Sequence, residues 1–198
     1  MNKKILNLML DIETIGTTVD SIILSYDFFT FELPGMDNQS NEPIGIGRDI
    51  SVFSSLVAHR KSDRSTEDFW AAPEREAAMN DIMEFQKNAV PFAQAMNELY
   101  EFLNMLQDKF TVYYWGRGAS TFDLPILSHA MRSVVGESYK EPWQFWQIMD
   151  VRSIVRFAKW CGLKPVKSTA GIEHTASTDV KNQIEEIKQA WCFINGLD

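Results

Sequence analysis

One stretch constrains the fold of this chain more than any other, and it covers residues 6–16, Leu-Asn-Leu-Met-Leu-Asp-Ile-Glu-Thr-Ile-Gly. An apolar run from Leu8 to Leu10 leads directly into two acidic residues, Asp11 and Glu13. The run predicts a buried strand, and side chains two positions apart on a strand share a face. We therefore expect both carboxylates to point the same way from the end of a central strand, where a divalent cation with oxygen ligands would relieve their repulsion.

Taken alone, this Asp-x-Glu pair is weak evidence for a metal site, because acidic residues at strand ends are more often solvated surface groups. The metal interpretation depends on matching residues later in the chain. Gly16 follows the pair and lets the backbone turn tightly or approach a ligand closely.

Length and composition bound the possible classes of protein. The 198 residues, 45% of them hydrophobic, suffice for one well-packed α/β domain over residues 1–198 and are few for two. We expect no membrane span, because no run of about 18 apolar residues occurs, and no signal peptide precedes the first strand. Two cysteines without a CxxC motif argue against a disulfide framework or a zinc site and favour a reducing compartment. The net charge of -8 argues against non-specific duplex binding, although a strand could lie in a locally basic groove.

Periodicity and turn residues predict the order of the elements. Strands are expected over residues 21–31, 50–57 and 110–115 and near 147–149, with a loop rich in glycine and proline over 33–49. Helices are expected near 66–72, after Pro73, and over 92–106, 121–135, 151–161 and 180–194. This order predicts one mixed sheet flanked by helices.

Two further segments carry candidate ligands. Asp123 lies just beyond the fourth expected strand, where it is either a metal ligand or, with Ser120, part of a capping box. His174 ends a Thr-Ala-Gly loop, and Asp179 begins the last expected helix. A surface histidine and an acid that favours the helix dipole are the ordinary interpretations of these two residues.

Taken together, the motifs resemble those of the DnaQ-like 3′–5′ exonucleases, in the DEDDh subgroup. Order and spacing agree along nearly the whole chain. Further segments are similar to the RNase T-like branch, which contains exonuclease A of T-even phages, although Phe69 stands where relatives often carry a second tryptophan. The matching motifs are Asp11-x-Glu13, Phe122-Asp123 and His174-x-Ala-x-x-Asp179, and the further segments are Thr66-Glu-Asp-Phe-Trp, Trp115-Gly-Arg-Gly and Glu141-Pro-Trp-Gln-Phe-Trp.

The resemblance implies a ribonuclease H-like α/β fold with a five-stranded mixed sheet ordered 3-2-1-4-5. It also implies a cytoplasmic enzyme, of a bacterium or a phage-infected host, that degrades single-stranded DNA or RNA from the 3′ end to 5′-mononucleotides, with DNA favoured. Two ions, Mg²⁺ or Mn²⁺, would be held by Asp11, Glu13, Asp123 and Asp179. His174 would act as general base, since its unperturbed pKa near 6.5 suits work at neutral pH.

Several residues are candidates for contacts with the substrate. By the same resemblance, Thr14, Ile15 and Gly16 would border the terminal nucleotide, with Phe122 nearby. Trp70 is either a stacking platform for a base or a core residue packed on the sheet.

Positive charge near the site is open to two interpretations. Arg117, between two glycines, either meets a phosphate or pairs with a surface acid. The most basic stretch is interpreted as a solvated helix face; it consists of Arg152, Arg156, Lys159, Lys164 and Lys167.

One rival function belongs to another class, namely a non-catalytic module that binds single-stranded 3′ ends. The complete set of four acids and one histidine argues against it, because a binder has no need of such repulsion. An NTP-dependent enzyme lacks the Gly-x-x-x-x-Gly-Lys loop. The sequence does not decide between a monomer and a dimer.

Overall fold

The computed structural model describes residues 3–164 and 175–197. Its centre is a five-stranded mixed sheet in the order β3-β2-β1-β4-β5, which confirms the predicted order. β1 pairs antiparallel with β2 and parallel with β4, β2 pairs antiparallel with β3, and β4 pairs parallel with β5. The strands are β1 (Ile5–Thr14), β2 (Ile23–Phe31), β3 (Gly45–Asp49), β4 (Thr111–Gly116) and β5 (Ile148–Asp150).

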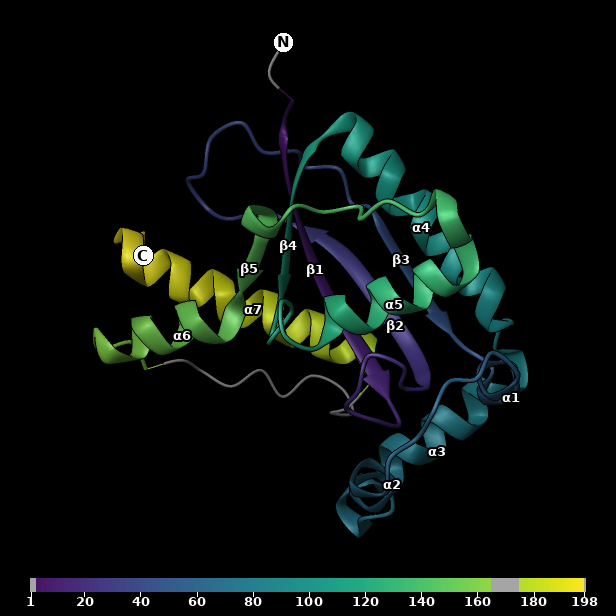
Figure 1. Cartoon of the computed structure of the whole chain (residues 1–198). Coiled ribbons are helices and arrows are strands. Elements are labelled where there is room, and N and C mark those ends of the chain that lie inside the picture. Colours follow the sequence, from purple (N-terminus) through teal and green to yellow (C-terminus); the bar gives the residue numbers. More distant parts are fainter. Residues whose placement is uncertain (1–2, 165–174, 198) are drawn as a thin grey trace.

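Helices cover both faces of the sheet (Figure 1). α4 and α5 pack on one face, and α6 and α7 pack on the other. α1, α2 and α3 form an excursion beyond one end of the sheet (Figure 1). The α-helices are α1 (Val52–Val57), α2 (Arg64–Trp70), α3 (Glu76–Phe85), α4 (Phe92–Lys109), α5 (Asp123–Val135), α6 (Val151–Trp160) and α7 (Ala176–Asn195), and the 3₁₀ turns are Pro73–Arg75, Gln86–Asn88, Gly136–Ser138 and Phe145–Gln147.

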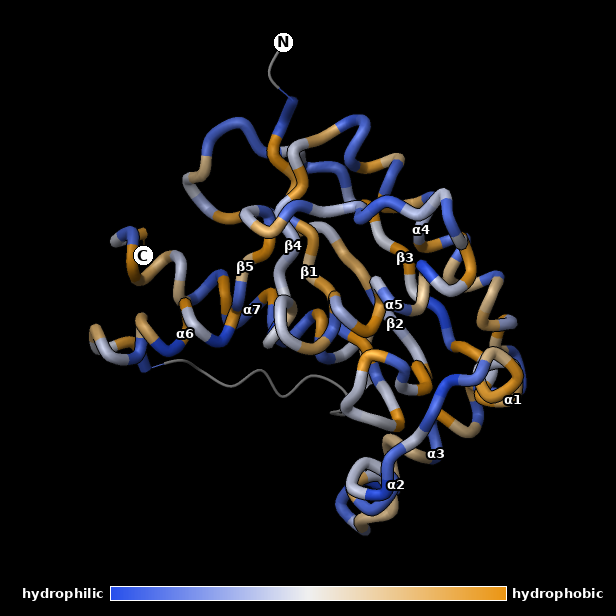
Figure 2. The backbone as a smooth tube through the Cα atoms, viewed as in Figure 1, coloured by the Kyte–Doolittle hydropathy of each residue, from blue (hydrophilic) through white to orange (hydrophobic). Residues whose placement is uncertain are grey.

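The central strand β1 is buried on both faces, as the apolar run predicts. Leu8 and Leu10 lie in the cluster under α4 and α5, whereas Met9 lies in the cluster under α6 and α7. Figure 2 shows the hydrophobic residues of β1 running through the middle of the molecule. Because side chains alternate along a strand, the next odd positions, Asp11 and Glu13, continue the face of Met9 toward α7.

The third strand does not lie where the sequence predicts it. β3 is Gly45–Asp49, inside the predicted loop, and most of the predicted strand is the helix α1, whose N-cap Ser51 accepts a hydrogen bond from the backbone of Ser54. A Cβ at Gly45 would lie 2.7 Å from the ring of Phe29, so glycine permits the close approach of this edge strand. Tertiary pairing and a good N-cap therefore outweigh the strand propensity of Val52 and Phe53.

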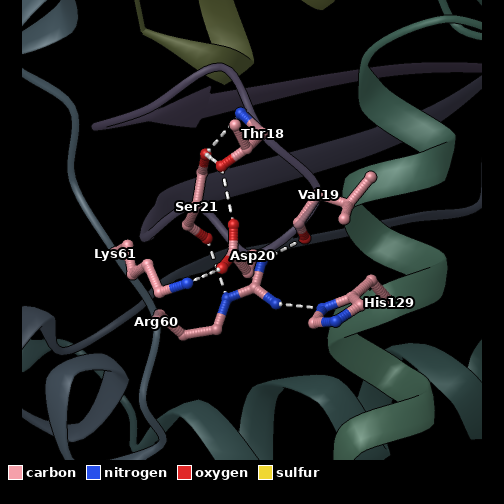
Figure 3. A network of polar contacts seen from close by, with 7 residues as sticks. All are labelled: Thr18, Val19, Asp20, Ser21, Arg60, Lys61 and His129. Carbon is pink, nitrogen blue, oxygen red and sulfur yellow. Dashed lines mark hydrogen bonds and ion pairs between the residues drawn. The ribbon is translucent and has the colours of Figure 1, made fainter.

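A buried arginine ties the β1–β2 turn to the rest of the fold (Figure 3). Arg60 is 4% exposed; its Nε donates to the carbonyl of Ser21 at 2.8 Å, and its Nη2 donates to the carbonyl of Val19 at 3.0 Å. The third nitrogen, Nη1, lies 2.8 Å from Nδ1 of His129 on α5. Since arginine only donates, His129 accepts at Nδ1 and carries its own proton on Nε2.

Among the residues that the structure describes, every helix is too short or too polar to span a lipid bilayer.

Candidate active site

Three carboxylates meet at the end of β1. Asp11 and Glu13 project from the same face of the strand, and Asp179 lies in the first turn of α7, which crosses that face. One carboxylate oxygen from each residue lies within 4.8 Å of one from each of the other two. The predicted convergence of these three residues is therefore present in the structure.

Asp123 joins the three carboxylates from the other side of the sheet's end. It is the first residue of α5 and only 5% exposed. The N-cap position belongs to Phe122, whose side chain offers no acceptor, so the capping-box alternative for Asp123 is not realised. Pro125 falls in the first turn of the helix, where a missing N–H costs little. The negative charge of Asp123 raises the pKa values of both Asp11 and Glu13, so the fourth acid lies within electrostatic reach of the others.

Burial and mutual repulsion shift the titration of this cluster. The pKa of Asp11 lies well above its usual range, first because the group is buried and then because Glu13, Asp123 and Asp179 surround it. Burial, with repulsion from Asp179 and Asp123, raises the pKa of Glu13 to about 8. Burial raises the pKa of Asp123 to about 7. The described residues around the cluster thus supply too little positive charge to keep all of these carboxyl groups ionised at neutral pH.

Gln183 supports the cluster and was missed by the sequence analysis. It lies one helical turn after Asp179 on α7 and is 3% exposed. Its Nε2 donates to Oδ1 of Asp11 at 2.8 Å and so fixes that carboxylate. The spacing of four residues from Asp179 places both on one helix face and was the available signal.

The donor set fits a hard divalent cation. Carboxylate oxygens are the ligands that Mg²⁺ and Mn²⁺ prefer, and three are already close together. The raised pKa values of Asp11 and Glu13 are consistent with such a ligand. A bound cation would supply the positive charge that the cluster lacks and would favour the ionised carboxylates. The Asp11, Glu13 and Asp179 group could therefore hold a metal ion.

The predicted general base, His174, lies outside the described residues. The described chain resumes at Thr175, the N-cap residue of α7, four residues before Asp179.

A cleft of about 340 Å³ opens beside Glu13. It brings together most of the residues predicted to contact the substrate, and it adds residues of α2 that the sequence analysis did not predict as substrate contacts. The predicted residues are Thr14, Gly16, Trp70 and Phe122, and the additional ones include Ser65, Thr66 and Phe69. Gly16 is also required by the fold, because a Cβ there would lie 2.4 Å from Oγ of Ser21.

Two predicted substrate residues lie elsewhere. Ile15 packs against the small cluster that contains Ile22 and Trp70. Arg117 is exposed and forms an ion pair with Glu186 of α7, which is the surface-pairing alternative. It lines a different depression, between α6 and α7.

The two adjacent aromatic residues of α2, Phe69 and Trp70, differ in exposure. Trp70 is 4% exposed, packs against Ile22 and Leu24, and donates from Nε1 to the carbonyl of Thr14 at 2.8 Å. The packing role is therefore present in the structure, at the wall of the cleft. Phe69 is 41% exposed and offers the more accessible ring.

Arg75 is a second residue that the sequence analysis missed. Its guanidinium lies 4.6 Å from the centre of the Phe69 ring, and its charge lowers the pKa of Glu13. Its Nε is buried and has no hydrogen-bond partner in the described part of the chain. A cation that faces an acidic cluster with an unused donor is suited to an anionic ligand.

Comparison with protein families decides the identity of the domain. The family model for the 3′-5′ exoribonuclease Rv2179c-like domain matches residues 6–191, almost the whole chain. This chain belongs to that family. It is a DnaQ-like 3′–5′ exonuclease domain, and no curated protein sequence matches it.

Solved structures agree on the fold. An exonuclease I from Methylocaldum szegediense superposes with a TM-score of 0.59 at 13% identity, over 96% of this chain and 43% of that one. The zinc-bound complex of E. coli exonuclease I with single-stranded DNA gives a TM-score of 0.58 at 12% identity, over 98% and 43%. The exonuclease domain thus spans less than half the length of these proteins, and the likeness establishes its ribonuclease H-like fold.

Proposed function

We propose that this exonuclease domain hydrolyses single-stranded nucleic acid from the 3′ end and releases 5′-mononucleotides, with two divalent cations, Mg²⁺ or Mn²⁺. The observation that carries the proposal is the convergence of Asp11, Glu13 and Asp179 within 4.8 Å, with Asp123 beside them. When bound, the cations would supply Lewis-acid stabilisation of the reacting phosphate. The motif resemblance supports the further proposal that, within the DnaQ-like enzymes, the domain belongs to the RNase T-like branch with phage exonuclease A.

The residues of the chain divide the work. Asp11, Glu13 and Asp179 would hold one cation, and Asp11 with Asp123 would hold the other. Gln183 keeps Asp11 oriented through the hydrogen bond to Oδ1. This support matters because a small displacement of a catalytic group can cost a large part of the rate.

The cleft beside Glu13 is the proposed seat of the terminal nucleotide. Its volume of about 340 Å³ and its mixed lining suit a nucleoside, with Phe69 and Trp70 on the side of the base. Arg75 would pair with a phosphate oxygen through the donor that has no described partner.

The choice between RNA and DNA is the finer part of the proposal. The description of the family favours RNA, whereas the sequence resemblance favours DNA. The test uses matched oligoribonucleotides and oligodeoxyribonucleotides that carry a label at the 5′ end. A ladder that shortens from the 3′ end in Mg²⁺, and stops with EDTA, supports the proposal, and the ratio of rates identifies the preferred sugar. Binding without shortening would support the rival binding module.

His174 is proposed as the general base that takes a proton from the attacking water. His174→Ala should lower kcat by about 10²–10⁴, the usual contribution of such a group, with little change in strand affinity. The wild-type rate should rise with pH through an inflection near neutrality that the variant lacks. Retained kcat with weakened binding would instead make His174 a substrate contact.

A further inference from the structure

Four basic side chains line one depression beside the carboxylate site. The depression has a volume of about 360 Å³ and lies where the β4–α5 loop, α6 and α7 meet. We call it the basic groove, and its lining consists of Arg117, Arg152, Val155, Arg156, Lys159 and Glu186.

The groove concentrates positive charge in a protein of net charge -8. Arg152, Arg156 and Lys159 follow the three–four spacing that places side chains on one helix face. Like charges at this spacing destabilise a helix, so helix stability does not explain the arrangement. Among the described lining residues, Glu186 is the only acid, and it pairs with Arg117.

The two segments that carry these cations are fixed to each other. Asp150 caps α6 by accepting from the backbone N–H of Ser153 at 2.7 Å. Its other carboxylate oxygen accepts from the backbone N–H of Gly118 at 2.9 Å. Asp150 therefore holds the loop that carries Arg117 against the first turn of α6, and the groove is preformed.

The groove opens beside the carboxylates. The β4–α5 loop that carries Arg117 leads directly into Asp123, and the charge of Arg152 acts on the carboxyl group of Asp123. The cleft beside Glu13 is lined by the end of β1 and by α2. In Figure 1, α2 lies below the arrowhead of β1 and α6 lies to its left. A strand with its 3′ nucleotide in that cleft could pass the carboxylates and continue along α6.

The length of the groove matches a short piece of strand. From Arg152 to Lys159 the helix rises about 10 Å, at 1.5 Å per residue. About three stacked nucleotides span the same distance at 3.4 Å each. We propose that the basic groove binds the phosphodiester backbone of the single strand on the 5′ side of the scissile phosphate. This inference rests on the proposed function, since it assigns the path of that substrate.

The test neutralises the two cations farthest from the carboxylates, in the double variant Arg156→Gln/Lys159→Gln. The probe is a fluorescein-labelled oligothymidylate dodecamer, with a matched oligouridylate, and binding is followed by anisotropy. Affinity should fall about tenfold or more at low salt, and the slope of log affinity against log salt should lose about 1.4, because each single-strand phosphate contact contributes about 0.7. The matched control is Lys4→Gln/Lys109→Gln, which removes two exposed lysines at the opposite end of β1 and should change neither quantity.

A second variant should change the strand affinity in the opposite direction. Glu186→Gln removes the acid that pairs with Arg117 and should tighten dodecamer binding several-fold. Unchanged affinity in the Arg156→Gln/Lys159→Gln variant, or an equal loss of affinity in the lysine control, would overturn the proposal that the basic groove binds the strand.

Kinetics then separate the groove from the proposed function. The double variant should raise KM for the dodecamer while leaving kcat/KM for a dinucleotide unchanged, because the dinucleotide does not reach the groove. An equal loss on both substrates would contradict the inference. If the wild type degrades neither substrate, the proposed function fails, and the anisotropy result still decides whether the groove binds a strand.

Discussion

The exonuclease domain buries two groups of charge, and it treats them in opposite ways. Arg60 is buried among two carbonyls and the ring nitrogen of His129, so each of its three guanidinium nitrogens has a described partner (Figure 3). The carboxylates of Asp11 and Glu13 are buried next to more negative charge, and their pKa values rise. A buried ion satisfied by its own protein stabilises the fold, whereas a buried cluster of like acidic groups is suited to a ligand that brings the opposite charge.

The largest expected effect comes from Asp11. Asp11→Asn should lower kcat by about 10³-fold or more, because the residue is shared by both proposed cations and each 1.36 kcal/mol of lost stabilisation costs a factor of ten. The same change should leave the chelated protein as stable or more stable, since it relieves repulsion. Steady-state kinetics with Mg²⁺ measure the loss of kcat, and thermal melting in EDTA measures the stability of the metal-free protein. Activity within tenfold of wild type would remove Asp11 from its bridging role.

Arg60 should behave in the opposite way. Arg60→Met leaves the carbonyls of Val19 and Ser21 without their donor, and we expect a loss of about 2–4 kcal/mol in the free energy of unfolding. For a chain of this size the melting temperature should fall by about 5–15 °C, while kcat per folded molecule stays near that of the wild type.

The control is Arg132→Met, which removes an exposed arginine of α5 whose described ion pair is long, at 3.8 Å from Glu141. It should cost less than about 1 kcal/mol. A large loss of kcat in Arg60→Met, at temperatures where the variant is folded, would contradict the assignment of a purely structural role to Arg60.

The metal-free protein should lose stability as pH rises. Folding raises the pKa of Glu13 from 4.5 to about 8, so between these pH values the folded state binds more protons than the unfolded state. The free energy of unfolding therefore falls with increasing pH across this window. The pKa of Asp123 is raised from 3.8 to about 7, so this residue causes a similar fall between those pH values. Saturating Mg²⁺ should abolish most of the fall, because it binds the ionised form. Parallel pH profiles with and without Mg²⁺ would show that the cluster does not take up the cation.

The smallest effect concerns His129. Burial and the charge of Arg60 lower its pKa, so the folded state favours the neutral ring. The unfolded state then binds more protons as pH falls below about 6.5, and stability declines on the acid side. His129→Gln keeps an acceptor for Arg60 and should reduce that decline. Melting curves at about pH 5.5 and 7.5, compared between variant and wild type in Mg²⁺, measure the difference.

Much of the site could be predicted because its chemistry depends on local spacing. The alternation of a strand fixes the common face of Asp11 and Glu13, and a helix start fixes Asp179. Gln183 and Arg75 could not be assigned in the same way. Gln183 is an unremarkable polar residue until α7 is placed on β1, and Arg75 meets Glu13 only through the path of the α2–α3 excursion.

The prediction of β3 was wrong because local propensity does not determine pairing. Val52 and Phe53 favour a strand in isolation, whereas the actual edge strand depends on Gly45 fitting against Phe29 of the neighbouring strand β2. Trp70 shows the same limit, since the sequence of a short helix does not tell which of two adjacent aromatic rings faces the sheet.

The double use of β1 has a consequence for how this domain tolerates change in its sequence. Its even positions build one core layer, and its odd positions build the other layer and then the acidic cluster. A single inserted or deleted residue before Asp11 would exchange the two faces, placing carboxylates in the apolar layer and leucines at the proposed cation site. A scan of insertions and deletions along residues 6–10 should therefore yield no variants that fold well yet lack activity. In this strand, selection for a folded protein also preserves the active one.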